Sequence, residues 1–356
     1  MLEPNVSLDG KTILITGAVG FIGANFTLKM LEECRNVHVI GLDNMNSYYD
    51  VSLKEYRLRK IEEAFGARPD SKWTFVRGDL SDAALLSELF GTHRPAVVVN
   101  LAAQAGVRYS ITNPQAYIES NVIGFFNILE CCRHNPVEHL VYASSSSVYG
   151  NNAKIPFSTD DKVDTPVSLY AATKKSNELF AHSYSKLYGI PTTGLRFFTV
   201  YGPAGRPDMA YFSFTNKLIQ GKTIEIFNFG NCKRDFTYVA DIVEGVFRVL
   251  RCAPKQKTGA DGLPIPPYRI YNIGNNAPEN LLEFVDILRQ ELMRAKVLPE
   301  DYDFEAHTKL VPMQPGDVEV TYADVSALER DFGYKPATSL RDGLRAFAEW
   351  YKEFYG

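Results

Sequence analysis

The sequence predicts an α/β fold: a doubly wound parallel sheet, followed by a smaller mixed α/β domain. Over the first two-thirds of the chain, short apolar runs alternate with amphipathic stretches. This alternation is typical of strands and crossover helices in a parallel sheet that is covered on both faces. After Arg196 the rhythm breaks down, and prolines such as Pro203 and Pro207 introduce shorter, mixed elements.

The apolar runs give the expected strands, in chain order Thr12–Thr16, Val37–Leu42, Trp73–Val76, Ala96–Leu101, His139–Ala143 and Thr192–Arg196. Helices are expected between and after them, at Gly20–Glu33, Val51–Ala64, Tyr117–Arg133 and Leu340–Tyr355. Residues 254–267 contain four prolines and two glycines, which is typical of a surface loop.

Composition excludes several classes of protein. With 38 basic and 42 acidic residues the net charge is −4, which gives no reason to expect nucleic acid as a partner. The five cysteines form an odd set without CxxC spacing, and the six histidines show no metal-ligand spacing. A signal sequence and an apolar stretch of membrane-spanning length are both lacking. We therefore expect a cytoplasmic protein without a metal or a membrane partner.

Three glycines directly follow the first expected strand and open the first helix. Gly17, Gly20 and Gly23 have the spacing GxxGxxG. Glycines here permit a tight turn and close approach of the backbone to a pyrophosphate. The N-terminus of the following helix also attracts the pyrophosphate, because its free N–H groups and dipole are positive. A structural turn would look similar, but the place between strand and helix favours a dinucleotide site of the Rossmann type.

Two acidic residues follow the next two strands. Asp43 lies twenty residues beyond Gly23, where its carboxylate can accept hydrogen bonds from the adenosine ribose. The same charge would repel the 2′-phosphate of NADP, and no Arg or Lys follows before Lys54, so NAD is the expected cofactor. The alternative for Asp43 is a helix cap or turn residue. Asp79 is expected either to contact adenine or to be a turn aspartate.

Tyr170 and Lys174 have the spacing i, i+4, which places them on one face of a helix. A neighbouring ammonium, together with the positive nicotinamide ring of NAD, is expected to lower the pKa of the phenol, so that it can act as a base. Alone, the pattern favours a solvated helix face, but downstream of a nucleotide-binding fingerprint it favours catalysis. Upstream, four serines at 144–147 follow an expected strand, where hydroxyls can meet a ligand, or where they simply form a serine-rich loop.

Taken together, TGxxGFIG, the acidic residue after the second strand, SSSxVYG and YxxxK resemble the extended short-chain dehydrogenase/reductase family. The chain is most similar to its nucleotide-sugar 4-epimerases, in particular the UDP-glucuronate 4-epimerases. The resemblance covers nearly the whole chain. It includes the segments 41–50, 102–108, 196–203 and 234–237.

The resemblance implies roles for individual residues. Tyr170 would be the base, Lys174 its partner, and Ser145 the hydroxyl that shares the sugar O4 proton. NAD would be bound by Gly17, Gly20, Phe21, Ile22, Gly23, Asp43, Asp79, Leu80 and Lys174. Arg234 would pair with the UDP diphosphate, and Asp317 would contact the uridine ribose.

Ser146 and Ser147 indicate the type of reaction. In the segment that corresponds to SSSVYG of this chain, related dehydratases have a pattern similar to TDEVYG and related decarboxylases one similar to TSEVYG. Both patterns have an acidic residue just before the valine. Here the corresponding residues are neutral. Without that carboxylate elimination lacks its acid/base pair, so the expected course is oxidation at C4, rotation of the 4-keto sugar, and return of the hydride to its other face.

The choice of sugar depends on Thr199 and Arg206. Relatives that act on neutral sugars frequently have Asn at the position of Thr199, and Arg206 resembles the arginine that glucuronate epimerases use against the C6 carboxylate. Ser146 and Ser147 are expected to add hydrogen bonds there. The alternative for Arg206 is a surface arginine paired with Asp208. UDP-glucuronate is thus the expected substrate.

Two other functions stay open from the sequence. One is a 4-epimerase for UDP-glucose or a UDP-N-acetylhexosamine, and the other is a non-catalytic NAD-sensing protein. We expect residues 1–196, with about 235–274 returning, to form the NAD-binding domain, and residues 197–234 and 275–356 to bind the UDP-sugar. The resemblance also implies a homodimer through helices near 117–133 and 168–188.

Overall fold

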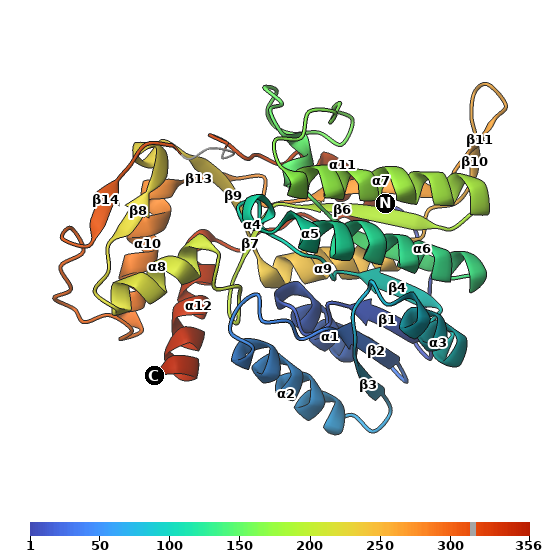
Figure 1. Ribbon diagram of the computed structural model, residues 1–356, viewed down its shortest axis with the longest axis horizontal. Coiled ribbons are helices and arrows are strands. Elements are labelled where there is room, and N and C mark those ends of the chain that lie inside the picture. Colours follow the sequence, from blue (N-terminus) through green and yellow to red (C-terminus); the bar gives the residue numbers. More distant parts are fainter. Residues whose placement is uncertain (314–317) are drawn as a thin grey trace.

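Seven apolar segments form one parallel sheet in the order β12-β6-β5-β4-β1-β2-β3. They are β1 (Thr12–Thr16), β2 (His38–Asp43), β3 (Lys72–Arg77), β4 (Val97–Asn100), β5 (His139–Ser145), β6 (Thr192–Phe197) and β12 (Tyr268–Ile273). The computed structural model describes residues 1–313 and 318–356 (Figure 1). It confirms the expected fold class, a doubly wound parallel sheet.

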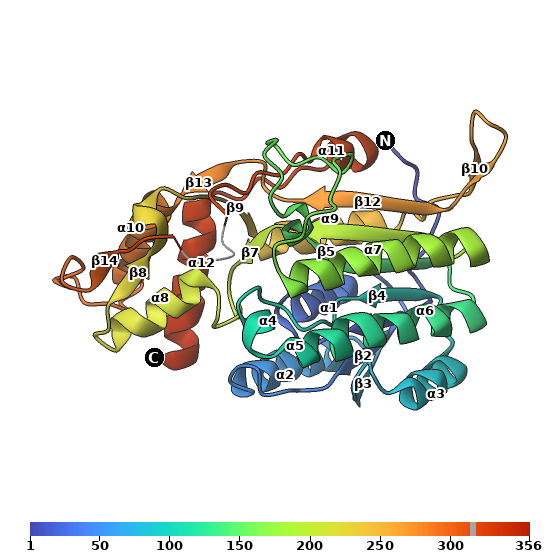
Figure 2. The same ribbon diagram turned by 45° about the horizontal axis from the view of Figure 1, so that its top comes forward.

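Helices cover both faces of this sheet because alternate strand residues point to opposite sides. Ile13 and Ile15 belong to a core with α1 (Phe21–Glu33), α2 (Ser52–Gly66), α9 (Val239–Leu250) and α11 (Ser326–Phe332). Leu14 between them belongs to the opposite core, with α3 (Ala83–His93), α6 (Gly124–His134) and α7 (Leu169–Tyr188). Figure 2 shows α6 and α7 side by side.

The strand order reverses at β1, which pairs with β2 on one side and β4 on the other. The connections that leave the carboxyl ends of β1 and β4 run in opposite directions, toward β2 and toward β5. A crevice therefore opens at their ends, which is where open α/β sheets bind ligands.

The expected single helix at 117–133 is wrong in detail. The chain forms α4 (Tyr109–Thr112), α5 (Pro114–Tyr117), a π-helical turn (Ile118–Ile123) and then α6. In the wide turn, Asn121 bonds both the backbone N–H and C=O of Gln104, at 2.8 and 3.0 Å. The turn thus fixes the loop after β4, as π-turns often do at functional sites.

The smaller lobe is made from short strands and helices (Figure 1). Its strands are β7 (Thr199–Tyr201), β9 (Lys233–Tyr238) and β13 (Pro278–Asn280) in one sheet, and β8 (Ile224–Ile226) and β14 (Thr308–Leu310) in another. Its helices are α8 (Ala210–Ile219), α10 (Leu281–Arg294) and α12 (Leu340–Tyr355). The stretch expected as a loop contains a small hairpin, β10 (Lys257–Thr258) and β11 (Pro264–Ile265).

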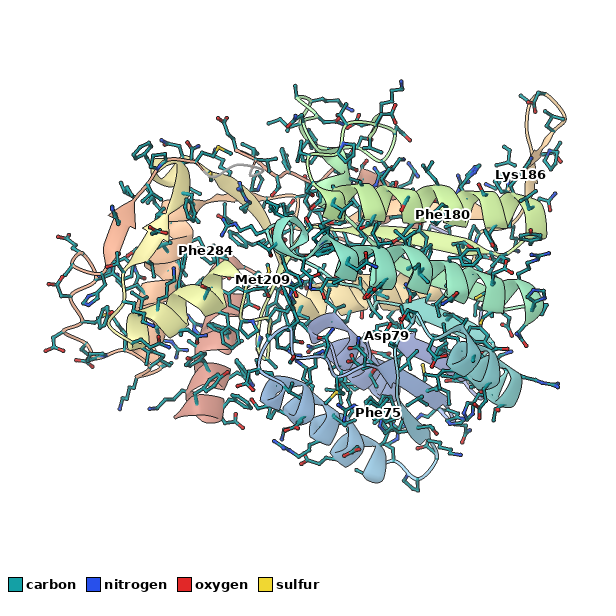
Figure 3. The ribbon with its side chains drawn as sticks, viewed as in Figure 1. Phe75, Asp79, Phe180, Lys186, Met209 and Phe284 are labelled. Atoms are coloured by element: carbon teal, nitrogen blue, oxygen red, sulfur yellow. The ribbon has the colours of Figure 1, made fainter. Side chains whose placement is uncertain are left out.

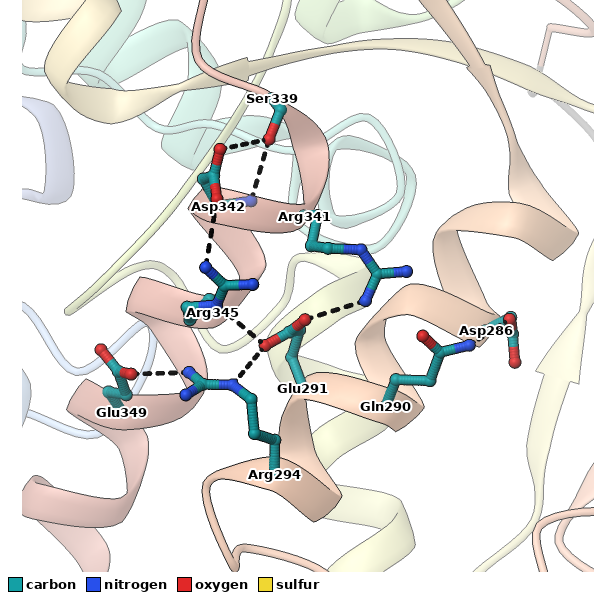
Figure 4. A network of polar contacts seen from close by, with 9 residues as sticks. All are labelled: Asp286, Gln290, Glu291, Arg294, Ser339, Arg341, Asp342, Arg345 and Glu349. Atoms are coloured by element: carbon teal, nitrogen blue, oxygen red, sulfur yellow. Dashed lines mark hydrogen bonds and ion pairs between the residues drawn. The ribbon is translucent and has the colours of Figure 1, made fainter.

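Helices α10 and α12 are joined by a charge network around one buried carboxylate. Glu291 of α10 accepts from Arg294 at 2.7 Å, from Arg341 at 2.9 Å and from Arg345 at 3.3 Å (Figure 4). Two of these arginines come from α12. The network therefore fixes the C-terminal helix against the core of the smaller lobe.

Segments after Arg196 divide between the two lobes. Strand β12 joins the large sheet beside β6, and α9 packs on α1. Strand β9, by contrast, pairs with β7 and β13. The assignment of NAD binding to one set of residues and UDP-sugar binding to the other stays a prediction.

Candidate active site

A cavity lies at the carboxyl ends of β1, β2, β4 and β5 and extends to the junction between the lobes. Many of the predicted site residues line it, namely Gly17, Gly20, Phe21, Ile22, Gly23, Asp43, Asp79, Leu80, Ser145, Tyr170, Lys174 and Arg206. In Figure 3, Asp79 lies in the large lobe and Met209, which also lines the cavity, lies where the lobes meet. Cofactor-type and catalytic-type residues therefore share one space.

The glycine-rich turn fits the pyrophosphate of a dinucleotide. Gly17 has φ +64°, and a Cβ there would lie 2.8 Å from the backbone N of Ala102. A Cβ on Gly23 would lie 2.0 Å from the Gly17 carbonyl oxygen, so only glycine lets α1 approach the turn this closely. Gly20 caps α1 without a side-chain hydrogen bond, which leaves the first amides of the helix directed at the cavity.

Asp43 ends β2 with its carboxylate at the cavity wall, suited to ribose hydroxyls. Its Oδ1 accepts from the backbone N of Met45 at 2.9 Å and lies 3.7 Å from Nζ of Lys54. Lys54 is buried on α2 and also donates to Asn46 Oδ1 at 3.0 Å. The cation lies beside Asp43 in space, which its distance along the sequence does not reveal.

Asp79 is a turn residue that also faces the cavity. Its carboxylate accepts from the backbone N and the hydroxyl of Ser81, at 2.9 and 2.8 Å, and from Asn44 at 2.6 Å. Burial opposes the charged form, but these hydrogen bonds outweigh it and lower the pKa of Asp79. The structure shows the turn aspartate, and contact with adenine stays a prediction.

Tyr170 and Lys174 lie in the first two turns of α7, which Ser168 caps by accepting from the N–H of Ala171. Lys174 is buried, and its Nζ donates to the carbonyl oxygen of Ala143 at 2.8 Å. Burial lowers the pKa of Lys174 to about 8. The strand end and the helix are thereby joined at the centre of the cavity.

The expected lowering of the Tyr170 pKa requires bound NAD as well as Lys174, and the side chains alone do not produce it. Burial raises the pKa of Tyr170, while a hydrogen bond with Ser145 and the charge of Arg206 act in the opposite direction. The Lys174 ammonium is directed to Ala143 instead. A phenolate at Tyr170 therefore needs more positive charge than the side chains supply.

A buried network supports the catalytic-type groups from behind. Glu178, one turn after Lys174, accepts from the Ser144 hydroxyl at 2.8 Å and from Arg196 at 2.8 and 2.9 Å. Arg196 also donates to Tyr149 at 3.0 Å. The network joins α7, β5 and β6, and so fixes the backbone on both sides of Ser145.

Arg206 comes from the loop between β7 and α8. Its guanidinium makes two contacts with Asp208, Nε to Oδ1 at 3.0 Å and Nη2 to Oδ2 at 2.5 Å. Tyr48 donates to the same carboxylate at 3.3 Å. Arg57 holds the loop by bonding the carbonyl oxygens of Ala204 and Gly205. The structure thus shows the Asp208 pairing and also places Arg206 in the cavity wall.

Four other predicted residues do not line the cavity: Ser146, Ser147, Thr199 and Arg234. The two serines form the start of a 3-10 turn (Ser146–Tyr149), and Thr199 opens β7 between two residues that do line the cavity. Arg234 of β9 donates to the carbonyl oxygen of Glu319 at 3.0 Å. Asp317 lies outside the described residues.

Sequence analysis missed several residues of the cavity wall. They include Asn44, Asn46, Tyr48, Tyr49, Lys54, Gln104 and Ser120. Four of them belong to the segment 41–50, which carried part of the resemblance without an assigned role. Gln104 belongs to segment 102–108, which also carried part of the resemblance without an assigned role for this residue. Spacing within a motif identifies such a segment, but not the direction of its side chains.

Two features are absent from residues 1–313 and 318–356. None of the helices there is long and apolar enough to cross a membrane. Over the same residues, His, Cys, Asp and Glu side chains form no group of three or more that could hold a metal ion. All five cysteines are buried and outside disulfides.

Comparison with known proteins gives consistent matches. The profile of the NAD dependent epimerase/dehydratase family matches residues 13–274. Protein CapI of Staphylococcus aureus is 51% identical, over 96% of this chain and 99% of its own length. UDP-glucuronate 4-epimerase 4 of Arabidopsis thaliana is 47% identical, over 98% of this chain and 76% of its own length.

A solved structure is similar over the full length. The UDP-glucuronic acid 4-epimerase of Bacillus cereus, in complex with UDP-glucuronic acid and NAD, superposes with a TM-score of 0.81. Sequence identity is 31%, and the match covers 97% of this chain and 100% of that one. The likeness therefore extends over both lobes and the cavity between them.

Proposed function

The chain belongs to the NAD dependent epimerase/dehydratase family, and from this premise we propose that it is an NAD-dependent UDP-glucuronate 4-epimerase. It interconverts UDP-glucuronate and UDP-galacturonate through a transient 4-keto sugar. The observation that carries the proposal is the lining of one cavity by Tyr170, Ser145, Lys174 and Arg206. The structure of the Bacillus cereus UDP-glucuronic acid 4-epimerase in complex with UDP-glucuronic acid and NAD supports it.

In the reaction, Tyr170 removes the proton of the sugar O4 and later returns it, with Ser145 sharing the hydrogen bond. Bound NAD would supply the hydride acceptor for C4, and its cationic ring would supply the positive charge that Tyr170 lacks. Lys174, held by Ala143, keeps a further positive charge on the cofactor side of the cavity. The glycine turn and Asp43 hold the dinucleotide at its pyrophosphate and ribose.

Arg206 determines the substrate in this proposal by binding the C6 carboxylate. A 4-keto glucuronate is a β-keto acid, which loses CO₂ when its carboxylate bond aligns with the carbonyl π system. A guanidinium that fixes the carboxylate in another orientation suppresses this loss. Ser146 and Ser147 supply no acid/base pair, which agrees with epimerisation rather than elimination. Their contact with the carboxylate, and the contacts of Thr199, Arg234 and Asp317 with substrate, stay predictions.

Product analysis tests the proposal. Purified protein incubated with UDP-glucuronate should give a mixture of UDP-glucuronate and UDP-galacturonate, without added NAD if the cofactor stays bound. UDP-pentose and CO₂ as the main products would contradict it. Turnover of UDP-glucose or a UDP-N-acetylhexosamine, with none of UDP-glucuronate, would favour the neutral-sugar epimerase instead.

We also propose that the protein is a cytoplasmic homodimer. Large apolar side chains are exposed along α6 and α7, among them Phe126 at 45%, Leu179 at 56% and Leu187 at 70%. Exposed apolar patches of this kind are typical of protein–protein contacts, and a second copy would cover them. Five buried cysteines outside disulfides agree with a reducing compartment.

A further inference from the structure

The carboxylate of Asp208 has the two-bond contact with Arg206 that a substrate carboxylate would need. A planar guanidinium forms such paired hydrogen bonds with carboxylates in general. Tyr48 donates to the same group, and burial, together with the Asp208 charge, raises the pKa of its phenol to about 12. Tyr48 therefore stays a donor at neutral pH. Three donor groups, Nε, Nη2 and the phenol, converge on one carboxylate.

We propose that Asp208 is an internal competitor of the substrate: it occupies Arg206 in the ligand-free protein and is displaced by the C6 carboxylate of the sugar. The inference rests on the proposed function, because a uronate brings the carboxylate that can make this exchange. Asp208 thereby becomes a residue that sets the affinity for acidic over neutral sugars.

The geometry permits the exchange. Arg206 lines the cavity, whereas Asp208 does not, and the Asp208 side chain is 33% exposed. Beside both donors stands Gly106, with φ +101°, where a Cβ would lie 3.0 Å from the Tyr48 hydroxyl and 3.8 Å from Nη2 of Arg206. The missing side chain leaves room next to the guanidinium, and Asp208 can turn outward to solvent.

The exchange also keeps the charge beside Tyr170 constant. Arg206 lowers the pKa of Tyr170 and Asp208 raises it. When one carboxylate replaces another at Arg206, this balance is preserved. A neutral sugar brings no carboxylate, so Asp208 stays in place and Arg206 contributes nothing to its binding.

Binding measurements on Asp208→Asn test the proposal. The Kd for UDP-glucuronate should fall about fivefold, the factor that corresponds to the ~1 kcal/mol of an exposed ion pair of good geometry. The Kd for UDP-glucose should not change. Asp301→Asn, which removes an exposed carboxylate in the loop after α10, controls for net charge. Asp208→Ser repeats the test should the Asn variant melt below the wild type.

Each other outcome overturns the inference. A higher Kd for UDP-glucuronate would show that Asp208 positions Arg206 for the substrate. An equal change for both ligands, or none, would show that Asp208 does not compete. The proposed function is tested separately on the wild type, by its formation of UDP-galacturonate, so the two failures are distinguishable.

Discussion

Glu178 and Arg196 form a buried ion pair with two hydrogen bonds, of 2.8 and 2.9 Å, directly behind the proposed catalytic residues. Burial opposes the charge on Glu178, but Arg196 outweighs it and lowers the pKa of the carboxyl. Because Glu178 also bonds Ser144, the pair couples α7 to the strand end that carries Ser145. Stability and active-site geometry depend here on the same contact.

Glu178→Gln should therefore destabilise the fold strongly. Removing one partner leaves the other charge buried and uncompensated, which typically costs about 3–5 kcal/mol. Urea unfolding measures the loss. Glu62→Gln, an exposed position on α2, should change the free energy of unfolding little. Equal stabilities of the Glu178 variant and the wild type would show that the pair is not structurally important.

Tyr170→Phe should abolish epimerisation while the protein still binds NAD. The substitution removes the group that transfers the O4 proton, and such a group typically contributes about 10²–10⁴-fold in rate. The ring itself still fills its partly buried place in the cavity wall. Product formation and cofactor absorbance of the purified variant measure the two effects. Residual turnover within threefold of the wild type would assign the base to another residue.

The activity should fall as the pH rises through about 8, the pKa to which burial lowers Lys174. Below this pKa the side chain is an ammonium that keeps a positive charge on the cofactor side of the cavity, where it acts together with bound NAD; above it that charge is lost. A profile of kcat/KM against pH measures the alkaline limb. Lys186→Gln, at the far end of α7, should keep the limb unchanged (Figure 3). A profile flat to pH 10 would contradict the role.

Leu179→Asp should convert the proposed dimer to a monomer. Leu179 is 56% exposed on α7, and a charge there would be buried without a partner in a dimer. Sedimentation analysis measures the mass. Ile219→Asp places the same charge at a comparably exposed apolar position on α8, outside the proposed interface, and should leave the mass unchanged. A wild-type monomer at micromolar concentration would refute the dimer itself.

The fold was predictable from sequence because six of the seven strands in the large sheet are separate apolar runs. Burial on both faces leaves little room for polar residues in strands such as Val97–Asn100, so the pattern is local and visible. The i, i+4 relation of Tyr170 and Lys174 is equally local. It predicted one shared face, which the cavity lining bears out.

The contacts that the sequence did not predict are those between side chains from distant parts of the chain. Lys54 lies eleven positions beyond Asp43, yet their charged atoms are 3.7 Å apart because α2 returns past the end of β2. Tyr48 reaches Asp208 from 160 residues away. The direction of Lys174 toward Ala143 likewise depends on the depth of α7 against β5. Such contacts follow from packing, which no local spacing encodes.

His139 should make stability depend on pH below neutrality. It is fully buried, with its ring nitrogens 3.0 Å from the Leu250 carbonyl and 2.9 Å from the Thr193 hydroxyl, and burial lowers its pKa to about 4. The unfolded chain, with a value near 6.5, binds more protons between these limits. The contribution is complete above pH 6.5 and lost as the pH falls to 4, about 3 kcal/mol in total. For His139→Gln, the free energy of unfolding should therefore decrease less steeply as the pH falls. For the variant His134→Gln, at an exposed position, it should follow the wild type. Parallel curves for His139→Gln and the wild type would mean that His139 is protonated in the native protein.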